Sequence, residues 1–332
     1  MTTAPDARAT LATIAAAAGV SLPTVSKVIN GKADVAAGTR ARVQQLLAEH
    51  NYLPVGSRRP GNDLLVDLVF TALDSPWAVE ILRGVTDSGL EIVVSAMAGG
   101  PKGSWVQRLV QSGRRGAILV SSAMTSAERR IIERARLPLV VIDPVDMPGP
   151  EVPSVGATNW AGGLAATQHL LALGHTRIAM IGGPPSYLCS RARIDGYRAA
   201  LEQVGIACDP ALIRHGDFHH EGGYRETQVL LGLPDRPTAV FAGSDEHALG
   251  AIEAARVAGL AVPDDLSVVG FDDLPVARWS SPPLTTIRQP LSDMGRAAGR
   301  MLRQLMDDQP LESQRVELAT ALISRASTAA PR

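Results

Sequence analysis

Short apolar runs rich in Val, Ile and Leu alternate with helical stretches from Asp63 onward, and they constrain the fold of this chain more than any other feature. Seven of these runs read as buried strands, namely 64–70, 92–94, 116–120, 139–142, 178–181, 239–241 and 268–269. Apolar strands separated by helices are typical of a parallel α/β architecture. Because about 270 residues follow and the strands fall into two groups, we expect two similar lobes that face a cleft.

The composition is that of a folded globular protein. The chain has 332 residues, of which 45% are hydrophobic and 20% charged, and at about 100–200 residues per domain this length allows two or three cores. Cys189 and Cys208 have neither metal-ligand spacing nor the density of a disulfide scaffold, which favours a reducing cytoplasm. No segment reaches the roughly 18 apolar residues of a membrane span. The apolar segment 11–20 follows Arg8 and Asp6, so we expect a helix of a folded domain there and not a signal peptide.

The charge is distributed unevenly along the chain. Up to Gly61 there are seven Lys and Arg residues against three Asp and Glu residues, a net charge of +4. Since the whole chain carries −1, the remainder carries −5. A small basic head on a large acidic body indicates a polyanionic partner for the head.

The basic head has the pattern of three short helices. The first covers residues 11–18, with Thr10 as its N-cap and Gly19 as its C-terminal stop. A second helix follows Ser21, and a third runs from about 37 to 50. This order is that of a helix-turn-helix, whose second helix enters the major groove of DNA. A three-helix bundle without a ligand is the alternative.

The second helix leaves a distinctive set of residues on its outer face. These are Leu22, Pro23, Thr24, Ser26, Lys27 and Asn30. Small hydroxyls and an amide suit phosphate contacts, Lys27 suits guanine acceptors, and Leu22 suits a thymine methyl group.

The run TLATIAAAAGVSLPTVSKVINGKADVAAGTRARVQQLLAEHNYLP, residues 10–54, resembles the DNA-binding domain of the lactose-repressor (LacI) family. The most specific part of it is AGVSLPTVSKVING. The resemblance implies that Leu22, Pro23 and Lys27 read bases. It also implies that four further residues contact the DNA backbone, namely Thr10, Thr24, Ser26 and Asn30. The partner is then double-stranded operator DNA.

The linker after Pro54 departs from the pattern of that family. The family usually continues with a hinge helix whose leucine wedges into the minor groove, whereas this chain has Gly61 at that place. Gly56 and Pro60 oppose helix formation by roughly 1 and 3 kcal/mol. Arg58 and Arg59 suit DNA phosphates or a narrow minor groove. A merely flexible basic linker remains the alternative.

The body resembles the periplasmic-binding-protein-like sensor domain of the same family. The matching runs are NWAGGLAATQHLLALGHTRIAMIGG, SRARIDGYRAAL, AGSDEHALGAIEAARVAGLAVPDDLSVVGFDD and SPPLTTIRQP. The resemblance thins between Gly84 and Trp105, where we expect the first helix of the body to be short, from Val79 to about Val85. The implied fold is a small all-α helix-turn-helix head plus an α/β two-lobed body. We expect a head at 1–54, a linker at 55–62 and an effector-binding and dimerisation domain at 63–332.

The resemblance also implies which residues hold an effector. They are Trp77, Asp143, Arg193, Phe218, Ser244, Asp245 and Asp272. Arginine and carboxylates supply paired donors and acceptors for vicinal hydroxyls, and aromatic faces stack on the apolar face of a sugar ring. As alternatives, Arg193 and Asp272 form a structural ion pair across the cleft, Trp77 belongs to the core, and Asn159 is only a helix cap.

Signatures of enzymes and metal sites are poor. The chain has no G-x-x-x-x-G-K-[ST], no G-x-G-x-x-G after a strand and no H-E-x-x-H, and the segment from Gly243 to Asp245 is not a nucleophile elbow. The group of His215, His219, His220 and Glu221 lacks a matching set of ligands. We therefore expect no cofactor, no metal and no catalytic residue.

Together these features predict a cytoplasmic, sequence-specific transcriptional regulator. The most consistent role is a repressor of carbohydrate-utilisation genes that a small sugar effector releases from DNA. A homodimer is expected because two heads read the half-sites of a pseudo-palindrome. The chain ends in RASTAAPR without leucine heptads, so no tetramer-forming terminal helix is expected. The alternatives are a sugar-binding transport-type protein, a regulator with a non-sugar effector or co-repressor, and an enzyme that uses Asp245 and Asp272.

Overall fold

The computed structural model describes residues 11–29, 32, 34–49, 65–97 and 104–332. It divides into two compact units, Met1–Asp63 with Gln107–Gly113, and Leu64–Val106 with Arg114–Arg332. The predicted boundaries of the linker lie within residues 50–64, outside the described residues.

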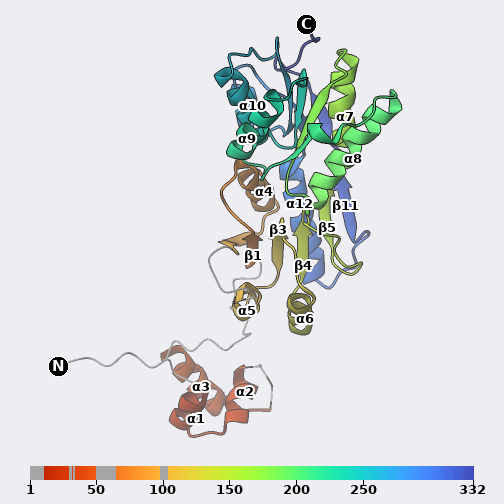
Figure 1. Cartoon of the computed structure of the whole chain (residues 1–332). Helices are drawn as coiled ribbons and strands as arrows, with labels where there is room; N and C mark the ends of the chain where they lie inside the picture. Colours follow the sequence, from red (N-terminus) through yellow and green to blue (C-terminus); the bar gives the residue numbers. More distant parts are fainter. Residues whose placement is uncertain (1–10, 30–31, 33, 50–64, 98–103) are drawn as a thin grey trace, which may run out of the picture. The chain divides into compact units, whose positions relative to one another are not determined.

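The first unit contains the three predicted helices, α1 (Leu11–Ala18), α2 (Leu22–Ile29) and α3 (Ala37–Glu49) (Figure 1). They pack around Ile14, Val25 and Val43, which are all fully buried. Gly19 ends α1 with a φ of +69°, a conformation that glycine adopts at little cost. The helix-turn-helix order predicted from the apolar spacing is therefore confirmed.

The first lobe of the body is a sheet in the order β11-β5-β4-β3-β1-β2. Its strands are β1 (Leu65–Phe70), β2 (Glu91–Ala96), β3 (Ala117–Val120), β4 (Leu139–Ile142), β5 (Ser154–Ala157) and β11 (Arg315–Leu318). All neighbouring strands are parallel. The helices of this lobe are α4 (Pro76–Asp87), α6 (Ser126–Ala135) and α12 (Leu291–Met306). Helix α5 (Ser104–Gln111) begins in this unit, and its residues from Gln107 onward are grouped with the first unit.

The second lobe repeats this plan in the order β12-β10-β9-β8-β6-β7. Its strands are β6 (Ile178–Gly182), β7 (Ile213–His215), β8 (Ala239–Ala242), β9 (Ser267–Asp272), β10 (Thr285–Arg288) and β12 (Ala321–Ile323). Only β12 is antiparallel to its neighbour among the described strands. The helices are α7 (Asn159–Ala172), α8 (Leu188–Gln203), α9 (His220–Leu231), α10 (Asp245–Val257) and α11 (Pro275–Trp279). Two apolar cores fill this lobe.

The two-lobed α/β body was predicted correctly, but details differ. Strands β5, β7, β10, β11 and β12 were missed. The expectation of a shortened first helix was wrong, because α4 has 12 residues and begins with Ser75 as its N-cap and Pro76 in its first turn.

The chain passes between the lobes three times, after β5, after β10 and after β11. The first and third crossings are tied together, since the hydroxyls of Thr158 and Thr320 lie 3.0 Å apart and the Thr320 N–H donates to Thr158 Oγ1 over 3.0 Å. Such connections between two lobes can act as a hinge.

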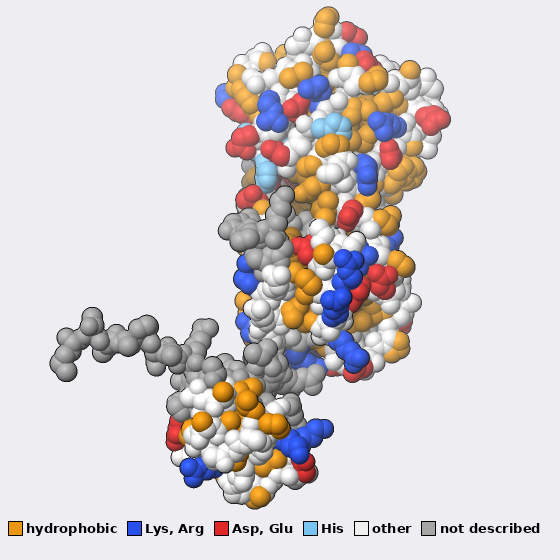
Figure 2. Space-filling view, turned by 60° about the horizontal axis from the view of Figure 1, so that its bottom comes forward, with side chains coloured by type: hydrophobic (Ala, Val, Ile, Leu, Met, Phe, Trp, Pro, Cys, Tyr) orange, Lys and Arg blue, Asp and Glu red, His pale blue; other side chains and the backbone are white. Residues whose placement is uncertain are grey.

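Basic and acidic side chains are interspersed on the face of the body shown in Figure 2, as is usual for a surface exposed to water. Among the described helices, no single one is long and apolar enough to cross a membrane. Residues Leu11–Ala18 and Leu22–Val28 meet the requirement only as a pair bent by 98°.

Candidate functional site: an interlobe cleft and a helix-turn-helix face

A cavity of about 170 Å³ lies between the two lobes of the body. Its walls are formed where strands β1, β3, β4, β7, β8 and β9 end, so both sheets present their carboxyl ends to it. Crevices at the carboxyl ends of parallel strands are the usual ligand sites of open α/β sheets. The position of the cavity is thus a consequence of the topology.

The backbone around the cavity is strained. Ser121, Asp143, Phe218 and Asp272 all line it, and all have a positive φ, at 47°, 46°, 72° and 117°. Such conformations are unfavourable for residues other than glycine and cluster at binding sites. The surrounding structure stabilises these four conformations, and all four residues line the cavity.

Arg193 lies at the base of the cleft and is only 3% exposed. Its Nε donates to Asn159 Oδ1 over 2.9 Å, and its Nη1 donates to the carbonyl of Gly243. Its Cζ lies 3.7 Å from the centroid of the Phe271 ring. Asn159 therefore orients the guanidinium in addition to its place at the start of α7.

Two carboxyl groups share the cleft with this guanidinium. Burial raises the pKa of Asp143, against the opposing charge of Arg193. Burial likewise raises the pKa of Asp272 to about 7, although Arg193 and a hydrogen bond from Gln289 Nε2, 2.7 Å long, favour its ionised form. Arg193 and Asp272 both belong to the second lobe, so the suggested ion pair across the cleft is not formed.

Aromatic side chains complete the walls. Trp77 in the first turn of α4 and Phe218 after β7 both line the cavity from opposite lobes. Trp77 also packs against the core of the first lobe, so the two readings of this residue are compatible. Ser244 lines the cavity as the N-cap of α10.

Asp245 is the one predicted effector residue that the structure does not bring to the cavity. It is fully buried, and its carboxylate accepts hydrogen bonds from the Leu274 N–H over 2.7 Å and from Thr286 Oγ1 over 2.5 Å. Its contacts fasten α10 to β10 and to the start of α11. The other six predicted residues converge on the cleft.

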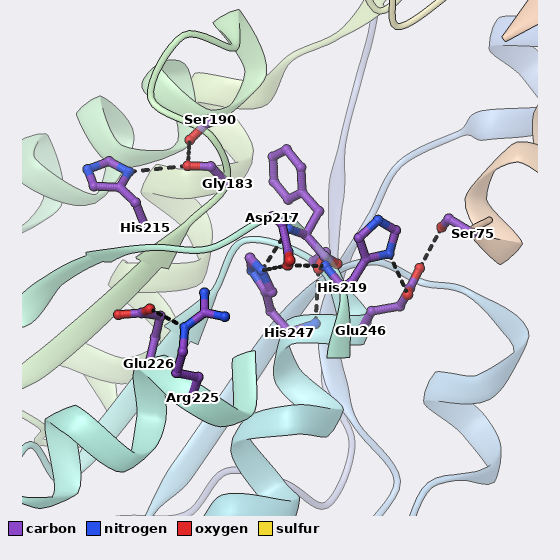
Figure 3. Close-up of polar contacts among 12 residues, drawn as sticks. Ser75, Gly183, Ser190, His215, Asp217, His219, Arg225, Glu226, Glu246 and His247 are labelled. Carbon is purple, nitrogen blue, oxygen red and sulfur yellow. Dashed lines mark hydrogen bonds and ion pairs between the residues drawn. The ribbon is translucent and has the colours of Figure 1, made fainter. Parts of the chain in front are cut away.

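The sequence analysis missed a polar bridge across the mouth of the cleft. Ser75 Oγ of the first lobe donates to Glu246 Oε1 of the second over 2.5 Å, and His219 Nδ1 lies 3.4 Å from Glu246 Oε2. His219 Nε2 lies 3.8 Å from Asp74 Oδ2 of the first lobe. Figure 3 shows Glu246 joined by dashed lines to both His219 and Ser75. Glu246 directly follows Ser244 and Asp245, two predicted effector residues, and this position was the only indication of its role in the sequence.

In the first unit, the predicted reading face of α2 is open to solvent. Leu22 is 48% exposed, and Pro23, Ser26 and Lys27 are also exposed. Lys27 Nζ donates to Asp34 Oδ2 over 2.7 Å, and this bond lowers the pKa of Asp34. Thr24 is half-buried, with its hydroxyl 2.9 Å from that of Ser21. Thr10, Asn30, Arg58, Arg59 and Gly61 lie outside the described residues.

The described residues contain no group of three or more His, Cys, Asp or Glu side chains arranged to hold a metal ion. Cys189 and Cys208 are free thiols, and burial raises the pKa of Cys189 to about 12. At neutral pH this thiol is not a nucleophile.

A helix-turn-helix unit on the same chain as a two-lobed body with a strained polar cleft defines a ligand-responsive DNA-binding regulator. Residues 10–55 match the family of bacterial regulatory proteins called the lacI family, and residues 167–328 match a periplasmic binding protein-like domain. The chain belongs to the lacI family of transcriptional regulators.

Relatives in this family match nearly the whole chain. The ribose operon repressor of Escherichia coli (strain K12) is 34% identical over an alignment of 329 positions, which covers 96% of this chain and 99% of the relative. The transcriptional regulator CelR in complex with cellobiose has a TM-score of 0.74 at 34% identity, over 96% of this chain and 100% of that one. The lac repressor dimer bound to operator and the anti-inducer ONPF has a TM-score of 0.71 at 29% identity, over 98% and 100%.

Proposed function

We propose that this protein is a repressor of carbohydrate-utilisation genes that binds operator DNA as a homodimer and leaves it when a small sugar binds in the cleft. The cleft carries this proposal. Arg193 beside Asp143 and Asp272 supplies charged donors and acceptors for vicinal hydroxyls, and Trp77 and Phe218 supply faces for a sugar ring.

Two relatives support the choice of a sugar. One is named as a ribose operon repressor, and another was solved with cellobiose. In this proposal the protein acts only by binding DNA and sugar, without a catalytic residue or a cofactor. A regulator that reads genomic operators works in the cytoplasm.

The head supplies the DNA contacts in this proposal. Leu22, Pro23 and Lys27 read bases in the major groove, while Thr10, Thr24, Ser26 and Asn30 contact the backbone. Arg58 and Arg59 of the linker contact phosphates. The lac repressor relative was solved as a dimer on its operator, and a dimer of this chain would likewise place two heads on a pseudo-palindrome.

Replacing Arg193 tests the role of the cleft. Arg193→Ala removes a buried charged donor and should weaken sugar binding by about 2–5 kcal/mol, because ligand groups and Asp143 or Asp272 lose their partner. Operator binding should persist without a response to sugar. Calorimetry with D-ribose, cellobiose and a wider sugar panel provides the measurement, with operator binding followed by fluorescence anisotropy.

Arg198→Ala is the matched control, since Arg198 lies on the same helix, is exposed and pairs with Asp195 at 3.0 Å. It should bind sugar like the parent. Normal sugar affinity in Arg193→Ala would show that the cleft is not the effector site.

A further inference from the structure

Phe218 stands in the cleft in a conformation that an aromatic residue rarely adopts. Its φ is +72°, in the left-handed region, and its ring lines the cavity 5.6 Å from Arg193 Cζ. A bulky residue persists there only if its surroundings hold it.

The first turn of α10 holds both polar groups of the Phe218 backbone. The Phe218 N–H donates to His247 Nε2 over 2.8 Å, and Ser244 Oγ donates to the Phe218 carbonyl over 2.7 Å. The His247 N–H in turn donates to Ser244 Oγ over 3.0 Å, so the three bonds form a closed ring. Figure 3 shows His247 reaching from α10 to the segment that carries Asp217 and His219.

His247 is fully buried, and its ring stacks on that of Phe218 with centroids 5.7 Å apart and planes 26° apart. Because Nε2 accepts the Phe218 N–H, the imidazole is neutral and carries its proton on Nδ1. Asp217 Oδ1, 3.8 Å from Nε2, therefore faces a neutral ring and forms no ion pair with it. Burial lowers the pKa of His247 to about 4, which agrees with this state.

Two neighbouring glycines leave space for the rings of Phe218 and His247. A Cβ at Gly183 would lie 2.0 Å from the Phe218 ring, and one at Gly216 would lie 2.5 Å from His247 Nε2. Such distances are far below van der Waals contact. A side chain at either glycine would therefore displace one of the two rings.

We propose that His247 is a positioning residue, whose neutral imidazole fixes the strained backbone of Phe218 and thereby sets the aromatic wall of the effector cleft. The inference rests on the proposed function only in taking the cleft as the effector site. His247 is not among the residues that line the cavity, and its side chain acts through Phe218.

The position of the Phe218 ring can be measured directly, because the chain has only four phenylalanines. The full-length protein is labelled with 4-fluorophenylalanine, and the ¹⁹F resonance of Phe218 is assigned by its loss in Phe218→Leu. His247→Leu removes the acceptor for the Phe218 N–H and should shift or broaden this resonance alone. His247→Gln also removes the stacked ring and its contribution to the chemical shift, but its side-chain oxygen can accept the same bond, so the Phe218 resonance should be as narrow as in the parent.

A control separates positioning from general stability. His175 is 2% exposed and bonds to Thr238 Oγ1 and to the Ala329 carbonyl, neither of which belongs to the Phe218 segment. His175→Leu should lower the unfolding temperature and leave the Phe218 resonance unchanged. An unchanged Phe218 resonance in His247→Leu, or an equal change in His175→Leu, would overturn the proposal.

A measurement on the parent covers the case in which His247→Leu does not fold. With ¹⁵N-labelled histidine, one imidazole should be unprotonated at Nε2 and remain neutral at pH 5.5, and its signals should vanish in His247→Gln. A His247 that is protonated at that pH contradicts the proposal. Addition of D-ribose or cellobiose to the ¹⁹F-labelled parent then tests the effector site separately, since no response to any sugar would count against the proposed function and not against the role of His247.

Discussion

Lys27, which we propose as a base-reading residue, pairs with a carboxylate of the head. Its ammonium group bonds to Asp34 at 2.7 Å although both side chains are more than half exposed. To reach a base, Lys27 must exchange this carboxylate for a guanine acceptor. An exposed pair of this kind is worth about 0.2–1 kcal/mol, so the exchange is cheap.

Lys27→Ala should weaken operator binding by about 1–3 kcal/mol and relax the preference at one base position of each half-site. Asp34→Ala should tighten binding by roughly two- to fivefold, because Lys27 no longer has a competing partner. Anisotropy titrations against a set of singly substituted operators measure both. A Lys27→Ala protein that binds every operator like the parent would show that the reading face of α2 is wrong.

His247 should give the protein a specific acid sensitivity. Its pKa is about 4 in the folded chain and near 6.5 in an unfolded one, so below pH 6.5 the unfolded state takes up a proton that the folded state refuses. Through His247, the free energy of unfolding therefore decreases as the pH falls from 6.5 to 4, by at most about 3 kcal/mol. Asp143 and Asp272 act in the opposite direction, because their raised pKa values favour the folded state as the pH falls.

Comparison with His247→Gln isolates this residue, since every other group titrates in both proteins. Urea unfolding from pH 7 to pH 4 should show that the free energy of unfolding of the parent falls relative to the variant. A difference that stays constant over this range would be inconsistent with a buried neutral His247.

At the residue scale, the resemblance to a known family predicted side chains that lie in recognisable runs of sequence. Arg193 and Asp272 lie in the recognisable R-x-x-G-Y and GFDD runs, and the topology delivers both to the cleft. Asp245 belongs to an equally recognisable run but turns into the core, because Leu274 and Thr286 offer it hydrogen bonds there. A motif gives the position of a residue on an element and not the direction of its side chain.

At the scale of elements, the atypical sequence of the linker leads to a separate prediction. With Gly61 in place of a wedge leucine, affinity should depend more on phosphate contacts than on unstacking of the central base step. Replacing Arg58 and Arg59 together by Ala should flatten the salt dependence of operator binding by up to about two units, with little change in base preference. Titrations from low to high salt test this, and an unchanged slope would mean that neither residue meets a phosphate.

The strands predicted from the sequence were those that consist of a continuous apolar run. Strands β3, β4 and β8 are fully buried and read as unbroken apolar runs. Strands β7 (IRH), β10 (TTIR) and β11 (RVEL) are short and carry polar or charged residues, so periodicity alone does not separate them from loops. Their places are set by pairing with other strands, β7 with β6, β10 with β9 and β11 with β5, and a local pattern does not contain this pairing.

At the scale of the whole body, the bridge between Glu246 and Ser75 should favour closure of the lobes on a ligand. Glu246→Ala removes a charged hydrogen bond across the cleft mouth, and sugar affinity should fall by about tenfold. Glu253→Ala on the same helix is the control, since Glu253 pairs with Arg256 at 2.7 Å on the surface. Equal sugar affinities in the two variants, measured by calorimetry, would exclude the bridge as a determinant of closure.

The most direct test of the account is the coupling between the cleft and the head. The purified chain first selects its operator from random DNA, and the affinity for that operator is then measured with and without a sugar whose binding Arg193→Ala abolishes. The account predicts that the sugar weakens operator binding, and that the operator weakens sugar binding by the same factor. A sugar that occupies the cleft and leaves the affinity for the operator unchanged would contradict it.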